Sequence, residues 1–272
     1  MVLNLAYCQY WPQNHAPLLT NRKMGTCNPE VGKSGTDRKS EIVMQAVIIA
    51  GGLGTRLGKL TANQPKSLIP ILGKPFIEYQ FDFLKKGGIT DIVLCLGYQG
   101  QQIAEYCGNG NKFGVNLKYS FEDKPLDTAG ALKLAGPLLQ NYFFSLYGDS
   151  YVFIDFKDMF DNPQKKNKMG AMSVYYNQDR FDKSNTAVGD GLVTFYSKEQ
   201  RANLKYIDYG VNLFRKEVLN LIPQDKPYSM GTLFNQLIAR QELLAYEVKQ
   251  RFYEIGSVNG LTEFTEYVKG KI

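Results

Sequence analysis

From Gln45 onward, short apolar runs alternate with stretches that have a helical spacing of apolar residues, and this alternation constrains the fold most. The runs QAVIIA, DIVLCLG, NLKYSF and NYFFSLYGD begin at residues 45, 91, 116 and 141. Between them lie KPFIEYQFDFLKKGG, QQIAEYC and DTAGALKLAGPLL, the first of which ends in lysines and glycines as helix C-termini prefer. The alternation predicts an α/β fold with a Rossmann-like, mainly parallel sheet flanked by helices.

After about residue 165 the pattern changes. The segments GAMSVYYN, GLVTFY and YIDYGVNLF predict antiparallel strands, which would form a small subregion over one end of the sheet. Two further helices, in MGTLFNQLIARQ and GLTEFTEYVKG, flank the strands expected in LLAYEV and RFYEIG.

Residues 1–43 differ from the rest because they have no sustained apolar period and contain many turn-forming residues. We interpret them as a poorly ordered leader. Met44 directly precedes the first strand, so a natural start there, with residues 1–43 as an added extension, is favoured over a functional docking arm. Residues 44–272 are then one domain.

Composition and charge exclude several classes of protein. Hydrophobic residues make up 44% and charged residues 21% of the 272 residues, which excludes extended disorder over most of the chain. The net charge of +6 is spread among acids, so no nucleic-acid partner is expected. No apolar run approaches the roughly 20 residues of a membrane span, and no signal peptide is present, so we expect no membrane partner and a cytoplasmic location.

The four cysteines, at positions 8, 27, 95 and 107, show no CxxC spacing. They also lack companion histidines, because the only histidine is His15. A zinc site or a disulfide framework is therefore not expected, and the cysteines are predicted to be free thiols.

The glycine-rich segment AGGLGTRLG, residues 50–58, follows directly on the first strand. Glycines allow backbone N–H groups to crowd around an anion, and Arg56 and Lys66 add positive charge, so the segment predicts a phosphate-binding loop. A dinucleotide-binding fingerprint fails because Leu57 stands where its third small residue belongs, and an ATPase-type loop fails because Leu60 stands where its hydroxyl belongs.

The stretch AVIIAGGLGTRLGKLT, followed closely by QPKSLIPILGKPFIEYQ, resembles the two opening signatures of the sugar-1-phosphate nucleotidyltransferases. The similarity continues through GYQGQQI, GNGNKFGVNLKYS, PLDTAGALK, YGDS, IDYGV and YEIGS, and so covers nearly all of residues 45–270. The chain looks most similar to the small bacterial enzymes that act on heptose- or muramate-type sugar phosphates and lack an appended β-helix.

The resemblance implies an enzyme that transfers a nucleoside monophosphate from a nucleoside triphosphate to a sugar 1-phosphate. The products are a nucleotide-sugar for cell-surface glycans and pyrophosphate; Mg²⁺ is the implied cofactor, and a homodimer is possible in the family. The base, whether guanine, uracil or thymine, and the sugar stay open. The alternatives are a catalytically silent regulatory subunit that binds nucleotide-sugars and, less favoured because of the glycine spacing, a nicotinamide-dependent oxidoreductase.

The resemblance also assigns residues to the nucleotide phosphates. Gly51, Gly52 and Gly54 would bring backbone amides to them. Arg56 would contact the departing pyrophosphate, and Lys66 would hold the α-phosphate as charge shifts during the reaction. The alternative for both cations is a solvated position on a surface loop.

Base recognition is assigned to backbone near Gly51 and to the DTAG turn, chiefly Thr128 and Gly130. The family usually has glycine where this chain has Asp127, and proline where it has Lys59. Both differences bear on which base is bound.

Two carboxylates are the implied Mg²⁺ ligands. Asp149, also expected to be catalytic, ends a strand and so should emerge at the carboxyl edge of the sheet, although an aspartate there can also be a turn former or cap. The second ligand is Glu254, where the family normally has aspartate. For the sugar, the matching positions are Asn185, Lys198 and Gly210; a turn asparagine, a surface lysine and a bulge glycine are equally compatible with the sequence.

Overall fold

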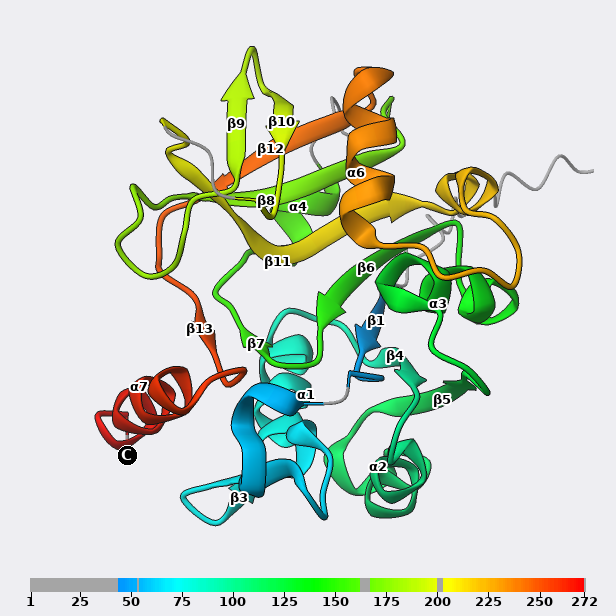
Figure 1. The fold of residues 1–272 in the computed structure, drawn as a ribbon. Helices are drawn as coiled ribbons and strands as arrows, with labels where there is room; N and C mark the ends of the chain where they lie inside the picture. The colour runs from blue at the N-terminus through cyan, green and yellow to red at the C-terminus, as the bar shows by residue number, and fades with distance from the viewer. Residues whose placement is uncertain (1–43, 53, 162–166, 200–202, 272) are drawn as a thin grey trace, which may run out of the picture. The chain divides into compact units, whose positions relative to one another are not determined.

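The computed structural model describes residues 44–52, 54–161, 167–199 and 203–271 (Figure 1). The predictions made for residues 1–43, among them a leader and the free thiols of Cys8 and Cys27, lie outside the described residues. In the part that is described, no helix is long and apolar enough to cross a membrane.

One mixed sheet of nine strands, in the order β5-β4-β1-β6-β11-β8-β12-β10-β9, forms the centre of the fold. Its strands, in chain order, are β1 Gln45–Ile49, β4 Asp91–Leu96, β5 Asn116–Phe121, β6 Tyr142–Tyr147, β8 Gly170–Tyr176, β9 Thr186–Gly189, β10 Leu192–Tyr196, β11 Tyr206–Arg215 and β12 Leu243–Val248. Strands β5, β4, β1 and β6 are mutually parallel, whereas β11 pairs antiparallel with both β6 and β8. The predicted α/β fold is confirmed, and its antiparallel strands continue the same sheet.

The parallel strands β4, β1 and β6 are buried on both faces, as strands covered by helices on each side must be, whereas the edge strand β5 is partly exposed. Every residue of β4 is buried, and alternate residues of β1 enter different hydrophobic clusters, Ala46 and Ile48 one and Val47 the other. This alternation is the two-residue period of a strand.

Helices cover both faces of the sheet (Figure 1). Their bounds are α1 Phe76–Lys86, α2 Gly100–Cys107, α3 Asp127–Ala135, α4 Phe156–Asp161, α6 Met230–Ala239 and α7 Val258–Lys269. Helices α1, α2 and α4 pack in the cluster of Ala46, and α3 and α6 pack in the cluster of Val47. Short 3-10 helices connect them at Thr55–Thr61, Lys66–Leu68, Asn111–Phe113, Gly136–Leu138 and Lys216–Leu221.

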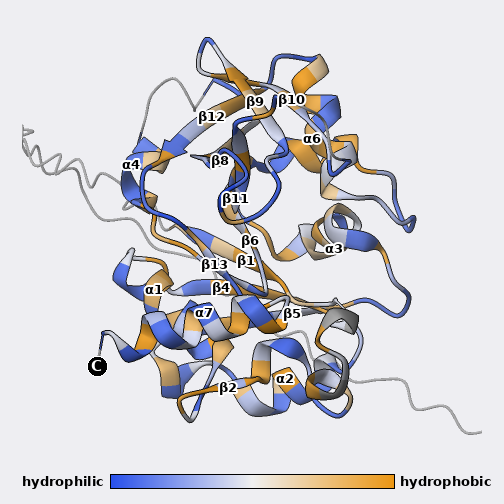
Figure 2. Ribbon diagram, turned by 60° about the vertical axis from the view of Figure 1, so that its left-hand side comes forward, coloured by the Kyte–Doolittle hydropathy of each residue, from blue (hydrophilic) through white to orange (hydrophobic). Residues whose placement is uncertain are grey.

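Helix α7 packs over a third, aromatic-rich cluster that includes Phe76 of α1 and its own Phe264. Figure 2 shows hydrophilic and hydrophobic residues on different sides of α7, as expected for a helix packed on one face. Just before it, β13 (Tyr253–Glu254) pairs with β7 (Ser150–Tyr151), and a hairpin of β2 (Pro70–Ile71) and β3 (Lys74–Pro75) precedes α1. The C-terminal segment is thereby held beside the end of β6.

Candidate active site

Three cavities follow one another along the carboxyl edge of the parallel strands, the edge where open α/β sheets bind ligands. Their volumes are about 550, 160 and 450 Å³, and we call them the first, second and third cavity. Thr128 lines all three, Gly52 lines the first two, and Tyr147 and Asp149 line the last two. The shared residues make the three cavities one continuous site.

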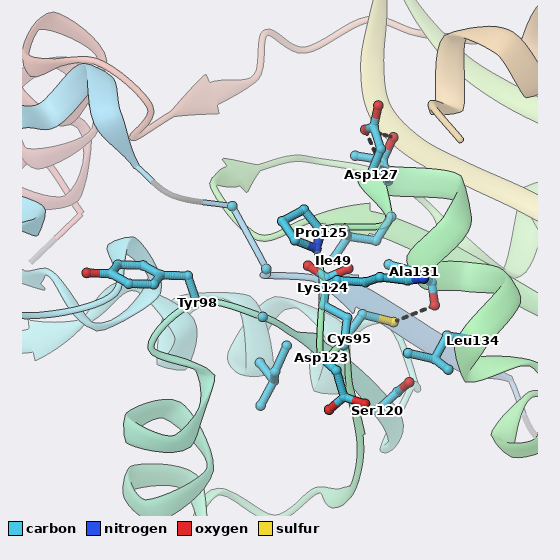
Figure 3. A pocket seen from close by; sticks show the side chains of 16 residues that line it. Ile49, Cys95, Tyr98, Ser120, Asp123, Lys124, Pro125, Asp127, Ala131 and Leu134 are labelled. Atoms are coloured by element: carbon cyan, nitrogen blue, oxygen red, sulfur yellow. Dashed lines mark hydrogen bonds between the residues drawn. The ribbon is translucent and has the colours of Figure 1, made fainter. Parts of the chain in front are cut away.

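The first cavity lies where β1, β4 and β5 end, opposite the start of α3 (Figure 3). Gly51 and Gly97 are two of its strand-end residues, and Cys95 and Ala131 line it as well. The Cys95 thiol donates to the carbonyl of Ala131 at 3.6 Å, and burial raises the pKa of this thiol to about 12. Cys95 is therefore a free but protonated thiol, as is Cys107, whose pKa burial also raises to about 12.

Glu122 is a residue of this cavity that the sequence did not single out. A Cβ on Gly51 would lie 2.9 Å from Glu122 Oε1, and one on Gly97 would overlap the same oxygen, so the two glycines make room for the carboxylate. The amide of Leu126 donates to Glu122 Oε2 at 3.1 Å. Burial raises the pKa of Glu122, and the hydrogen bond from Leu126 opposes that rise. The only signal in the sequence was an acid directly after a strand.

Asp127 has a backbone conformation that glycine adopts more readily than other residues. Its φ of +59° is in the left-handed region, which aspartate tolerates better than most residues with a side chain. Its carboxylate accepts hydrogen bonds from the amide and the hydroxyl of Thr128, at 2.6 and 3.1 Å. The Thr128 hydroxyl in turn accepts from the amide of Met230 at 2.8 Å, which fixes Thr128 where the three cavities meet.

Lys66 and Asp149 form an ion pair in the second cavity, with 2.6 Å between Lys66 Nζ and Asp149 Oδ2. Their side chains are only 17% and 19% exposed. Gln80 of α1 holds the turn of Asp149, because its side-chain amide donates to the carbonyls of Tyr147 and Ser150, each at 2.9 Å. Sequence analysis predicted both members of the pair, which lie 83 positions apart in the chain.

The β13–β7 pairing brings Glu254 to the third cavity. Glu254 pairs with Ser150, and the amide of Ile255 donates to the carbonyl of Asp149 at 2.9 Å. A Cβ on Gly260 of α7 would overlap the carbonyl oxygen of Glu254, so helix α7 packs directly on this strand. Asp149 and Glu254 therefore both line the third cavity, from segments that are remote in sequence.

The third cavity also holds the residues predicted to bind the sugar, Asn185, Lys198 and Gly210, together with Asp208. Gly210 has a φ of +92°, and its missing side chain leaves room for Ser150 and Tyr147. The Asn185 side chain binds the neighbouring strand, because its Oδ1 accepts from the backbone amide of Asp208 at 2.9 Å. Burial raises the pKa of Asp208 to about 6, against the opposing hydrogen bonds from Gly210 and Tyr147.

Comparison with known proteins agrees with this geometry. A sequence profile described as "Nucleotidyl transferase" matches residues 45–270. D-glycero-alpha-D-manno-heptose 1-phosphate guanylyltransferase of Campylobacter jejuni is 31% identical over 213 residues, which cover 78% of this chain and 95% of the relative. The chain belongs to the nucleotidyl transferase family. This confirms the predicted enzyme, a sugar-1-phosphate nucleotidyltransferase.

Two solved structures show how this transferase relates to others of its fold. HddC from Yersinia pseudotuberculosis, in complex with GMP-PN, has a TM-score of 0.71 at 25% identity and covers 82% of this chain and 99% of its own. CTP:phosphocholine cytidylyltransferase from Streptococcus pneumoniae has a TM-score of 0.66 at 27% identity, with 84% and 100% covered. The same fold therefore serves different bases and different phosphate acceptors, and the side chains of the cavities must select among them.

Three residues predicted to bind nucleotide are not placed at the site. Two of them, Gly54 and Gly130, do not line the three cavities, and the third, Arg56, has no described side chain. Gly54, at φ +66°, accepts the Thr61 hydroxyl at its carbonyl. Arg56 lies in the 3-10 helix Thr55–Thr61, and its side chain is outside the described part of the chain. Gly130 is buried in α3, and its amide donates to the carbonyl of Tyr228 at 3.0 Å. Their roles toward the nucleotide stay predictions.

Gly130 gives a first test. A Cβ there would lie 2.9 Å from the Leu126 Cβ and 3.1 Å from the Lys226 carbonyl oxygen, so Gly130→Ala must push α3 away from the segment before α6. We expect thermal unfolding to show a loss of about 1–3 kcal/mol. Gly136→Ala in the same region is the control, because its Cβ would meet only a flexible Leu219 methyl group at 3.2 Å. A raised KM for nucleotide at unchanged stability would instead support direct contact between Gly130 and the nucleotide.

Proposed function

We propose that this transferase moves GMP from GTP to a sugar 1-phosphate of the heptose or mannose class, with Mg²⁺ as cofactor. The observation that carries the proposal is the continuous row of cavities with the Lys66–Asp149 pair in the middle one. The first cavity would hold the base, the second the reacting phosphates and the third the acceptor sugar. The relatives whose names state a heptose or mannose 1-phosphate are guanylyltransferases, which supports this choice of substrates.

The reaction needs charge neutralisation and alignment more than proton transfer. A phosphate oxygen of the sugar 1-phosphate attacks the α-phosphorus of the nucleotide, and the bond from that phosphorus to the bridging oxygen of pyrophosphate breaks. The attacking oxygen is already ionised near pH 7, because the second pKa of a phosphate is about 6. No histidine is needed, and the only one in the chain, His15, lies outside the matched residues. Lys66 would stabilise the charge that develops on the α-phosphate.

The carboxylates of Asp149 and Glu254 fit Mg²⁺ better than a softer metal. In the described part of the chain no group of three or more histidine, cysteine, aspartate or glutamate side chains could hold a metal ion. Mg²⁺ is commonly bound by one or two carboxylates, with water and substrate phosphates completing its shell. Asp149 lines both the second and the third cavity, and Glu254 lines the third, so the two carboxylates border the space proposed for the phosphates. When bound, Mg²⁺ would screen the repulsion between the two phosphates.

Glu122 is our candidate for selecting guanine. Guanine presents two adjacent donors, N1–H and the N2 amino group, and an ionised carboxylate accepts both in a bidentate arrangement. Uracil and thymine offer a single ring N–H, so they leave one carboxylate oxygen without that bond. Glu122 Oε2 already accepts from the Leu126 amide, which fixes the orientation of the carboxylate in the first cavity.

Glu122→Gln is therefore expected to lower kcat/KM for GTP by roughly 10- to 100-fold, because the new amide group opposes one of the guanine donors. The values for UTP and dTTP should change much less. Steady-state rates with each nucleotide check this, with the exposed Glu105→Gln of α2 as the control. An unchanged preference among nucleotides would remove Glu122 from base recognition.

Pyrophosphate release tests the proposed function as a whole. The assay would combine GTP, UTP, dTTP and CTP with heptose 1-phosphate, mannose 1-phosphate and glucose 1-phosphate, with and without Mg²⁺. Turnover that is highest with GTP and depends on Mg²⁺ is the expected result. Nucleotide binding without turnover in every combination would favour the regulatory-subunit alternative. A homodimer and a cytoplasmic location belong to the same proposal, and light scattering of the purified protein measures the former.

A further inference from the structure

Gln80 is a polar residue on the buried, otherwise apolar face of helix α1. The other buried residues of this helix are Phe76, Ile77, Phe81 and Leu84, and the Gln80 side chain is itself 0% exposed. Among the described residues, its Oε1 has no hydrogen-bond partner although it is buried. An unpaired amide oxygen in the interior weakens the fold, so packing alone would favour an apolar side chain at this position.

The amide nitrogen of Gln80, in contrast, has two partners. Nε2 donates to the carbonyl oxygens of Tyr147 and Ser150, each at 2.9 Å. The opposite orientation of the amide would place Oε1 against these two carbonyl oxygens, so only the observed orientation makes hydrogen bonds here. Gln80 thus spans Gly148 and Asp149, the two residues that lie between its partners.

The same turn is held by contacts from three other segments. The Gly148 amide donates to the carbonyl of Ile49 at 2.9 Å, and the Gly148 carbonyl accepts the Ser67 hydroxyl at 3.4 Å. The Asp149 carbonyl accepts from the amide of Ile255 at 2.9 Å. These contacts join the turn to the end of β1, to the 3-10 helix of Ser67 and to the end of β13.

We infer that Gln80 is a positioning residue for the transfer reaction, because it fixes the turn that directs the Asp149 carboxylate into the second and third cavities. The inference rests on the proposed function, in which Asp149 binds the metal ion. Gln80 is absent from the described residues that line the three cavities, so it would act on the substrates only through Asp149.

The turn needs such a contact because of its glycine. Gly148 has more backbone freedom than any other residue type, so external hydrogen bonds must select one conformation of the turn. The groups that orient a metal-binding carboxylate typically change metal affinity or activity 10- to 100-fold when they are lost. A functional role of this kind accounts for a buried glutamine whose oxygen is left unpaired.

Gln80→Met tests the inference because methionine has a similar length but donates no hydrogen bond to the two carbonyls. We expect kcat for transfer to fall about 10- to 100-fold and the Mn²⁺ affinity without nucleotide, measured by electron paramagnetic resonance, to fall about tenfold. KM for GTP should stay within about threefold, since other elements form the cavity proposed for the base.

Gln45→Met is the matched control. Gln45 is also 0% exposed, and its side chain bonds Asp91 at 2.9 Å, the Leu138 carbonyl at 3.2 Å and the Gln140 amide at 2.8 Å. It begins β1, at the opposite end of this strand from the glycine-rich loop. The control variant should lose stability in thermal unfolding but keep the kcat and the Mn²⁺ affinity of the wild type.

The outcomes separate this inference from the proposed function. If the wild type transfers no nucleotide, the proposed function fails, and Mn²⁺ binding still tests the inference. If the wild type binds no Mn²⁺, if Gln80→Met binds it as tightly as the wild type, or if Gln45→Met loses as much affinity, Gln80 is structural and the inference fails. Gln80→Leu repeats the measurement should the methionine variant misfold; misfolding of both variants would equally assign Gln80 a structural role.

Discussion

Asp149→Asn is expected to lower Mg²⁺-dependent transfer by about a thousandfold or more while leaving the fold intact. The replacement is nearly isosteric, and the contacts that hold the turn use the backbone, since Gln80 donates to neighbouring carbonyls and Ile255 donates to the Asp149 carbonyl. What is lost is the negative charge that would bind Mg²⁺ and that pairs with Lys66. Rates across a Mg²⁺ titration, with thermal unfolding as the stability check, measure both parts of this expectation.

Two further variants make the test of the metal site specific. Glu254→Gln should be similarly damaging, whereas Glu254→Asp should keep substantial activity, because aspartate retains the carboxylate that would bind the ion. Asp190→Asn, in the exposed β9–β10 turn with a φ of +51°, is the control, since asparagine tolerates that conformation equally well. Wild-type rate and Mg²⁺ dependence in Glu254→Gln would mean that Glu254 only ends a strand and that Asp149 and the phosphates hold the ion.

The part of the fold from β1 to β6, in which strands and helices alternate, could be predicted because each of its strands appears in the sequence as a short, largely apolar run. The runs expected at QAVIIA, DIVLCLG, NLKYSF and NYFFSLYGD contain β1, β4, β5 and β6, each bounded by turn residues. Strands buried on both faces are mostly apolar, and in β1 and β4 every residue after the first belongs to an unbroken apolar run.

The order of the strands could not be predicted in the same way. Strand β11 joins the two halves of the sheet by pairing with both β6 and β8, so the antiparallel strands extend the sheet instead of lying over its end. Pairing partners are set by packing across the whole domain, and β7 and β13, with two residues each, are too short to leave a periodic pattern.

The site divides similarly between residues with a sequence signal and residues without one. Lys66 and Asp149 were predicted from signatures and lie together in the second cavity. Glu122 and Asp208 were not singled out, because a lone acid in a loop or a strand resembles a solvated side chain until its burial is known. Asn185 was expected at the sugar, yet its side-chain oxygen is directed at the backbone of Asp208.

Lys66→Met should lower the transfer rate by at least about a hundredfold, because it removes a preorganised positive group from the point where charge moves to the α-phosphate. The structure adds a second expectation that separates this role from that of a surface cation. Lys66 Nζ lies 2.6 Å from Asp149 Oδ2, so in the absence of nucleotide the ammonium and a divalent ion compete for the same carboxylate. The variant should therefore bind Mn²⁺ more tightly than the wild type without nucleotide, as measured by electron paramagnetic resonance, while transferring more slowly.

Both effects should be absent in Lys86→Met, the matched control, because Lys86 is exposed at the end of α1. With nucleotide bound, the phosphates would draw the Lys66 ammonium away from Asp149, and the difference in Mn²⁺ affinity between wild type and Lys66→Met should shrink. This coupling makes the nucleotide and the ion favour each other's binding, and by linkage each must raise the affinity for the other by the same factor. If wild type and Lys66→Met bind Mn²⁺ equally well without nucleotide, and the variant transfers at a near-normal rate, then Lys66 is a surface cation with no role in the reaction.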